Sequence, residues 1–97
     1  MNDDSFAPPP FKPDAALATL KRHLRDMRLL DRAGRFEWKG NPMVEVTLDG
    51  AVIVAKSVKR PARTPEWQTR RLANAAEVRR WTEDFKRQFS GWTADDD

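Results

Sequence analysis

The spacing of apolar residues changes twice along this chain, and these changes limit what it can fold into. Between residues 17 and 30, leucines and a methionine recur every three or four positions, the period of one buried helical face. From residue 36 to 55, apolar and polar residues mostly alternate, which is the period of a half-buried strand. The helical spacing returns over residues 78–89. A helix, a group of strands and a second helix are therefore expected to follow one another.

Capping residues set the expected ends of the two helices. Pro13-Asp14 fits the start of the first helix, because proline is tolerated in the first turn and an acidic side chain is favoured near the positive end of the helix dipole. Gly34 is predicted to stop this helix, as a glycine that takes positive φ just past a helix end. The last helix is expected to begin at Asn74, with Glu77 completing the cap, and to end at Gly91.

Asp49-Gly50 is the clearest turn signal between the helices. Both central positions of a type I′ hairpin turn need positive φ, which these residue types tolerate. With these two residues as the loop, Val46 pairs with Ile53 and both side chains face the core.

The turn before this hairpin and the segment after it are less constrained. A two-residue loop at 40–41 and a three-residue loop at 40–42 place Trp38 on opposite faces of the sheet. The longer loop is favoured because Pro42 cannot donate a hydrogen bond to a strand ladder. Residues 65–72 fit either a short helix or a fourth strand, and the pattern does not decide between them.

These elements predict an α+β fold built as a two-layer sandwich. A three-stranded antiparallel meander, with a fourth strand if residues 65–72 are extended, carries both long helices on one face. The single domain is expected to span residues 14–92. A flexible proline-rich tail is expected at 1–13 and a disordered acidic tail at 93–97.

The composition argues against catalysis. The 97-residue chain has no cysteine, which excludes disulfides, thiol nucleophiles and zinc sites built on thiolates. Its single histidine, His23, has no spacing relation to a nucleophile, and its four glycines form no phosphate-cradling loop. We therefore expect a non-enzymatic protein without cofactor, metal or small-molecule substrate.

No segment favours a membrane. The longest strictly apolar run covers residues 51–55, whereas a membrane-spanning helix needs about 20 apolar residues. The chain begins with Asp3 and Asp4 instead of a basic lead into an apolar segment, so no signal peptide is expected. A cytoplasmic location follows as the expectation.

A sheet that is covered on one face leaves its other face open. On the predicted registers this open face carries Met43, Val52 and Val54 among polar side chains. Apolar patches with a polar rim are typical of surfaces that bind other proteins. The first functional hypothesis is therefore a small binding or adaptor domain that seats a protein partner, or a second copy of itself in a homodimer, on these three residues.

Basic residues support an alternative function, nucleic-acid binding. The formal net charge is only +3, but the basic side chains gather in two places. Basic groups beside an aromatic side chain suit phosphate contacts and base stacking. One group forms a predicted ridge on the first helix: Lys21, Arg25, Arg28 and Arg32. The other group surrounds Trp67: Lys56, Lys59, Arg60, Arg63, Arg70 and Arg71.

The order helix, three strands, helix is similar to that of double-stranded-RNA-binding domains. The resemblance covers only the order of the elements. That family opens its last helix with a cluster of lysines after a glycine-containing loop, whereas this helix opens with Asn74-Ala75-Ala76-Glu77. No residue role is carried over, because a shared arrangement does not imply a shared function.

Overall fold

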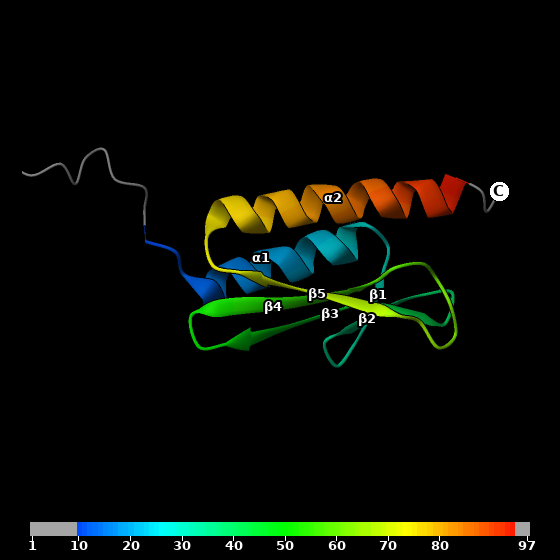
Figure 1. Ribbon diagram of the computed structural model, residues 1–97, viewed down its shortest axis with the longest axis horizontal. Helices are drawn as coiled ribbons and strands as arrows, with labels where there is room; N and C mark the ends of the chain where they lie inside the picture. Colours follow the sequence, from blue (N-terminus) through cyan, green and yellow to red (C-terminus); the bar gives the residue numbers. More distant parts are fainter. Residues whose placement is uncertain (1–9, 95–97) are drawn as a thin grey trace, which may run out of the picture.

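The computed structural model describes residues 10–94, which form two helices and five strands. The strands make one antiparallel sheet in the order β1-β2-β3-β4-β5, so that each strand pairs with the next along the chain. Both helices lie on the same side of this sheet (Figure 1). The elements are α1 (Pro13–Asp26), β1 (Leu30–Arg32), β2 (Arg35–Trp38), β3 (Asn41–Asp49), β4 (Val52–Val58), β5 (Trp67–Leu72) and α2 (Ala75–Ala94).

The predicted α+β class is confirmed, but the sheet is larger than expected. Residues 67–72 form β5, so the segment left open between helix and strand is extended. Residues 30–32 form β1, although the sequence assigned them to the end of the first helix. The sheet therefore has five strands where three or four were predicted.

Only the inner ends of the two predicted tails are described. Residues 1–9 and 95–97 lie outside the described residues, and with them most of both tails. Phe11 is half-buried and packs against the core. At the other end, α2 continues through Gly91 to Ala94, so the prediction that this helix stops at Gly91 was wrong.

The apolar spacing predicted a first helix that continues to Gly34, but α1 ends at Asp26. Leu30, counted in the apolar stripe, lies in β1 and is 55% exposed. Gly34 lies instead in the turn between β1 and β2, with φ of 87°, next to Ala33 at 55°. Its N–H donates a hydrogen bond to Oδ1 of Asp31 over 3.0 Å.

Arg28 terminates α1 by taking the left-handed conformation itself, with φ of 71°. Its N–H donates to the carbonyl of Arg25 over 2.9 Å, and the N–H of Leu29 donates to the carbonyl of Leu24 over 3.4 Å. These are the two hydrogen bonds of a Schellman motif, which is often accompanied by an apolar contact across the helix end. Leu24 and Leu29 are both buried in the same core cluster.

The turn between β2 and β3 is at Lys39-Gly40, so both loops considered from the sequence were wrong. The two residues have φ of 54° and 80°, positive at both positions as a type I′ turn requires. Trp38 then pairs with Asn41, and its ring meets that of Phe89 in α2 edge-on at 5.5 Å. Trp38 therefore faces the helices. The three-residue loop also predicted this face, although the turn that produces it is a different one.

A β-bulge follows in this hairpin, where the register shifts between Phe36 and Glu37. Phe36 pairs with Val44 and Glu37 with Pro42, which leaves Met43 as the extra residue of β3. Met43 is fully buried in the core cluster. It therefore does not lie on the open face of the sheet, where the sequence placed it.

The hairpin of β3 and β4 turns one residue later than predicted, through Gly50-Ala51. Gly50 has φ of 63° and Ala51 is not in the positive region, the pattern of a type II′ turn with glycine first. Val46 consequently pairs with Ala55 and not with Ile53. The shift moves the pairing by two residues, so the face assignment survives, and Val46 and Ile53 are buried as expected.

The start of α2 has the predicted cap. Oδ1 of Asn74 accepts a hydrogen bond from the N–H of Glu77 over 2.8 Å, and the Glu77 carboxylate accepts one from the N–H of Ala73, also over 2.8 Å. The capping side chains thus bond two backbone donors at the helix entrance.

The core lies between the helices and the sheet. Along α2, the rings of Trp81 and Phe85 are stacked at 5.5 Å, and those of Phe85 and Phe89 at 5.9 Å. These side chains meet the inward residues of the strands and of α1. The buried apolar residues are Leu20, Leu24, Leu29, Phe36, Met43, Val44, Val46, Ile53, Ala55, Val58, Leu72, Trp81, Phe85 and Phe89.

Candidate functional site

Ion pairs cover much of the open face of the sheet, the side away from the helices. Arg32 and Glu37 are 3.0 Å apart across β1 and β2, and Arg35 and Glu45 are 2.9 Å apart across β2 and β3. Near the β3–β4 turn, Arg71 of β5 reaches Asp49 over 3.0 Å. Cross-strand pairs of opposite charge suit a face in contact with water.

The apolar patch predicted on this face is smaller than the sequence suggested. Val52 and Val54 lie there as predicted, and both are half-buried. Met43 belongs to the core and contributes nothing to the patch. The hypothesis of a protein partner or second copy on this face stays a prediction, and of the three residues named for it only Val52 and Val54 lie there.

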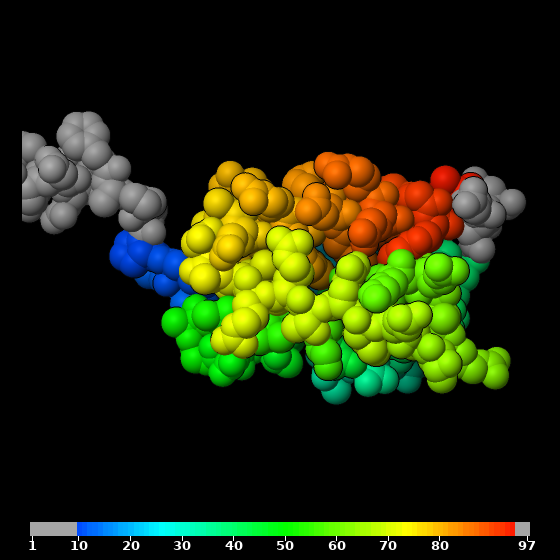
Figure 2. Space-filling view, viewed as in Figure 1, coloured from blue at the N-terminus to red at the C-terminus, as the bar shows by residue number. Residues whose placement is uncertain are grey.

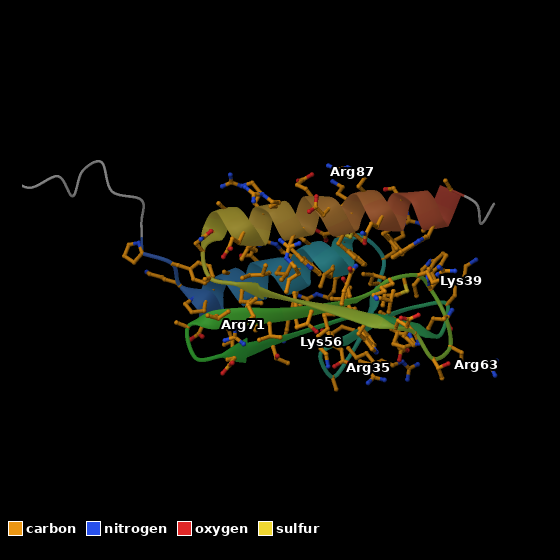
Figure 3. The ribbon with its side chains drawn as sticks, in the orientation of Figure 1. Arg35, Lys39, Lys56, Arg63, Arg71 and Arg87 are labelled. Carbon is orange, nitrogen blue, oxygen red and sulfur yellow. The ribbon has the colours of Figure 1, made fainter. Side chains whose placement is uncertain are left out.

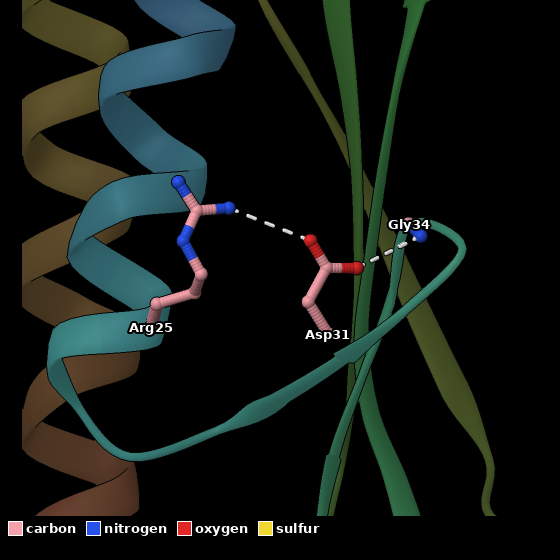
Figure 4. A network of polar contacts seen from close by, with 3 residues as sticks. All are labelled: Arg25, Asp31 and Gly34. Carbon is pink, nitrogen blue, oxygen red and sulfur yellow. Dashed lines mark hydrogen bonds and ion pairs between the residues drawn. The ribbon is translucent and has the colours of Figure 1, made fainter.

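The predicted basic ridge on the first helix is divided among three elements. Lys21 and Arg25 belong to α1, Arg28 to the turn that ends it, and Arg32 to β1. Arg25 pairs with Asp31 over 3.4 Å, and Asp31 also holds the backbone of Gly34 (Figure 4). The four residues therefore do not form one ridge on a single helix.

The second group of basic residues is brought together by β4, β5 and the loop between them. We call the side chains of Lys56, Lys59, Arg60, Arg63, Arg70 and Arg71 the basic segment. Between Lys56 and Leu72, the chain has six basic residues and one acidic residue, Glu66. Figure 3 shows Arg71, Lys56 and Arg63 spread from one end of the sheet to the other.

Backbone pairing fixes the direction of each member in the strands. Lys56 lies opposite Thr69 and Arg71 opposite Val54, so both side chains are on the open face. Arg70 lies opposite Ala55 and faces the helix side. Because neighbouring residues of a strand point to opposite faces, Arg70 and Arg71 present charge on both sides of β5.

The loop of the basic segment is closed at its base by Lys59 and Glu66. The N–H of Lys59 donates to the carbonyl of Glu66 over 2.9 Å, and Nζ of Lys59 is 3.7 Å from the Glu66 carboxylate. Arg60 and Arg63 lie in the loop beyond this closure, and both are exposed.

Most charges of the basic segment are not balanced by a carboxylate. Within the described residues 10–94, Lys56, Arg60, Arg63 and Arg70 have no ion-pair partner. The arginines of β1 and β2, by contrast, each have a carboxylate within 3.0 Å. Positive charge at the β4–β5 side of the sheet is therefore not neutralised by neighbouring carboxylates.

Trp67 is less available than the sequence suggested. It is half-buried at the start of β5, pairs with Val58 and packs against the core. Its ring anchors the loop of the basic segment to the domain, and the stacking role predicted for it stays a prediction.

Two hollows lie at the helices, and the sequence indicated neither. One, of about 630 Å³, lies between α1 and α2, where Ala15, Ala16 and Ala75 leave space between the helices. The other, of about 210 Å³, lies between α2 and β5. We call it the α2–β5 cleft, lined by Ser57, Gln68, Arg70, Trp81, Asp84, Phe85, Arg87 and Gln88.

Residues 10–94 contain no cluster of three or more His, Asp or Glu side chains that could hold a metal ion. In the same part of the chain, neither helix has the length and hydropathy required to cross a bilayer.

No known protein family, curated protein or solved structure matches this chain. Its function therefore has to be argued from its own residues.

Proposed function

We propose that this protein binds nucleic acid through the basic segment. The observation that carries the proposal is the unbalanced charge there. Lys56, Arg60, Arg63 and Arg70 have no ion-pair partner within residues 10–94, while Arg32, Arg35 and Arg71 each have a carboxylate partner. Cationic side chains that neutralise phosphates release the counterions condensed on the nucleic acid, and this release favours binding.

The shape of the segment supports a linear polyanion as the ligand. A six-residue strand such as β5 is about 20 Å long, and one strand of a duplex carries about six phosphates over that distance. The basic side chains come from β4, the loop and β5 and are spread along the sheet (Figure 3), so they do not form a compact pocket. Arginine, which makes up four of the six, bonds phosphate oxygens with two parallel N–H groups.

The sheet face supports a partner less well. Its apolar residues are the half-buried Val52 and Val54 and, in the edge strand β1, the exposed Leu30, and ion pairs cross the face on both sides of the valines. For this reason nucleic-acid binding, the alternative from the sequence, becomes the main proposal.

Fluorescence anisotropy with labelled 20-nucleotide single strands and 20-base-pair duplexes tests the proposal. Four phosphate contacts give a salt dependence that weakens single-strand binding about 50-fold between 50 and 200 mM salt. Arg60→Glu/Arg63→Glu is expected to weaken binding to both ligands and to lower the slope of log affinity against log salt by about two.

Arg79→Glu/Arg80→Glu is the matched control, because it changes the net charge equally at two exposed positions of α2. It is expected to keep most of the wild-type affinity. Equal losses in both variants would mean that overall charge, and not the basic segment, attracts the nucleic acid. Absence of binding by the wild-type protein at 50 mM salt would refute the proposal.

A further inference from the structure

The α2–β5 cleft opens beside Arg70, on the helix side of the sheet. Its back wall is apolar, since Trp81 and Phe85 are 3% and 2% exposed and their rings are stacked. Its other walls are polar and come from β4, β5 and α2. Figure 2 looks onto this side of the molecule, with the hollow between the orange residues of α2 and the yellow-green residues of β5.

Most polar groups of the cleft are unused by the fold. The side chains of Ser57, Gln68, Arg70 and Gln88 form no hydrogen bond and no ion pair with any other described residue. Arg87 and Asp84 pair with each other over 3.5 Å on the rim.

Ser57 is the most informative of these groups. It is 4% exposed, near the end of β4, where it pairs with Val44 on one side and Gln68 on the other. Among the described residues, every side-chain oxygen or nitrogen that is fully enclosed has a hydrogen-bond partner. The Ser57 hydroxyl, which has none, is therefore reached from the cleft. A buried hydroxyl without a protein partner is a group that a ligand can bond.

We infer that the α2–β5 cleft receives one unpaired base of a single-stranded nucleic acid whose phosphates lie along the basic segment. The inference rests on the proposed function and names its ligand more closely. Arg70, in the edge strand β5, belongs to the basic segment and lines the cleft, so a phosphate bound by Arg70 would lie beside the cleft.

The chemistry of the walls fits a base better than a phosphate. Base edges carry hydrogen-bond donors and acceptors together, and the serine hydroxyl and the two glutamine amides supply both kinds of group. Phosphate offers acceptors only and would lie near the Asp84 carboxylate. The volume of about 210 Å³ is also smaller than the roughly 300–1,000 Å³ of pockets for drug-sized ligands, which suits a single ring system.

A base in the duplex cannot enter, because its edge is paired and its faces are stacked. Proteins that read single strands take splayed-out bases against apolar or aromatic walls and bond their edges. The inference therefore separates single strands from duplexes, which the phosphate contacts of the basic segment do not.

The test compares Gln68→Leu/Gln88→Leu with the wild-type full chain in the anisotropy assay at 50 mM salt. The variant keeps the net charge and removes both amides from the cleft. Loss of two neutral hydrogen bonds is expected to weaken binding of 20-nucleotide oligo-dT or oligo-dA about tenfold. Duplex affinity is expected to stay unchanged. Thr69→Val is the matched control, because Thr69 is in the same strand on the open face.

A measurement on the unchanged protein covers the case in which the variant does not fold. In proton–nitrogen NMR spectra, addition of a trinucleotide is expected to shift the side-chain amide signals of Gln68 and Gln88. Shifts confined to the basic segment would overturn the inference.

The outcomes also separate the two proposals. Equal affinity for single strands and duplexes, unaffected by the glutamine variant, overturns the base site and leaves the proposed function standing. Loss of binding to both ligands in the Arg60→Glu/Arg63→Glu variant, together with loss of single-strand preference in the glutamine variant, supports both. A wild-type protein that binds neither ligand overturns both.

Discussion

Arg28 holds a backbone conformation that usually belongs to glycine. Its φ of 71° ends α1, and the left-handed region costs a residue with a Cβ about 1–2 kcal/mol. Glycine at this position loses more conformational entropy on folding, which offsets part of the gain. We expect Arg28→Gly to raise the free energy of unfolding by about 0.5–1 kcal/mol, as measured by urea denaturation.

Arg22→Gly provides the comparison, because Arg22 is exposed in the interior of the same helix. There glycine is expected to lower the free energy of unfolding by about 1 kcal/mol. Changes of the same sign at both positions would contradict the role given to the Arg28 backbone.

Residues in the left-handed region also explain why turn positions were predicted one or more residues off. Arg28, Ala33 and Lys39 all have positive φ without being glycine. Sequence rules assign that conformation to glycine first, so they predict a helix end at Gly34 and a loop that begins at Gly40. In both turns the glycine is the second positive residue, preceded by Ala33 or Lys39.

Among the elements, α2 depends on the cap at its start. Asn74 and Glu77 bond two backbone N–H groups there. Asn74→Ala is expected to lower the free energy of unfolding by about 1 kcal/mol, because the N–H of Glu77 loses its acceptor. Urea denaturation measures the loss.

Glu77→Gln tests the second half of the same cap. Glutamine reaches the backbone as glutamate does in this motif, so the variant is expected to lose less stability than Asn74→Ala. A larger loss for Glu77→Gln would mean that the charge near the helix start, and not the hydrogen bonds, stabilises α2.

The strands show which parts of an element the sequence determines. Alternation identified Val46 and Ile53 as core residues, and a two-residue slip of the hairpin left that assignment intact because the side-chain period is also two. The bulge at Met43 broke the alternation by one residue and moved that side chain into the core. Its trace in the sequence is the pair of adjacent apolar residues Met43-Val44, which alternation alone does not allow.

The candidate site was predictable to the extent that it is local in sequence. The basic segment could be found because its members lie within residues 56–71 and the charge excess is visible without a fold. The predicted ridge is not continuous on α1, because it required a helix through Arg32, which lies in β1. The α2–β5 cleft could not be found, since Ser57, Gln68 and Gln88 meet only through the pairing of β4 with β5 and the packing of α2.

For the whole molecule, added salt is expected to weaken nucleic-acid binding while the free energy of unfolding stays nearly constant. The ion pairs of residues 10–94 are on the surface, and exposed pairs contribute about 0–1 kcal/mol each and are screened by salt. Screening also relieves repulsion within the basic segment, which opposes that loss. The free energy of unfolding is therefore expected to change by less than about 1 kcal/mol between 50 and 500 mM salt.

Urea denaturation at the two salt concentrations checks this expectation. A stable fold at 200 mM salt also makes the anisotropy series interpretable, because weaker binding then reports lost phosphate contacts. A large drop in stability would assign the salt effect to unfolding instead.

The two outer strands differ in a way that bears on how the protein behaves when concentrated. β1 presents three residues, and β5 presents six with two adjacent arginines. A second molecule adding antiparallel to β5 would crowd four guanidinium groups together, and one adding to β1 would gain only a few hydrogen bonds. Both edge strands therefore disfavour the edge-to-edge pairing by which sheets of different copies join into filaments.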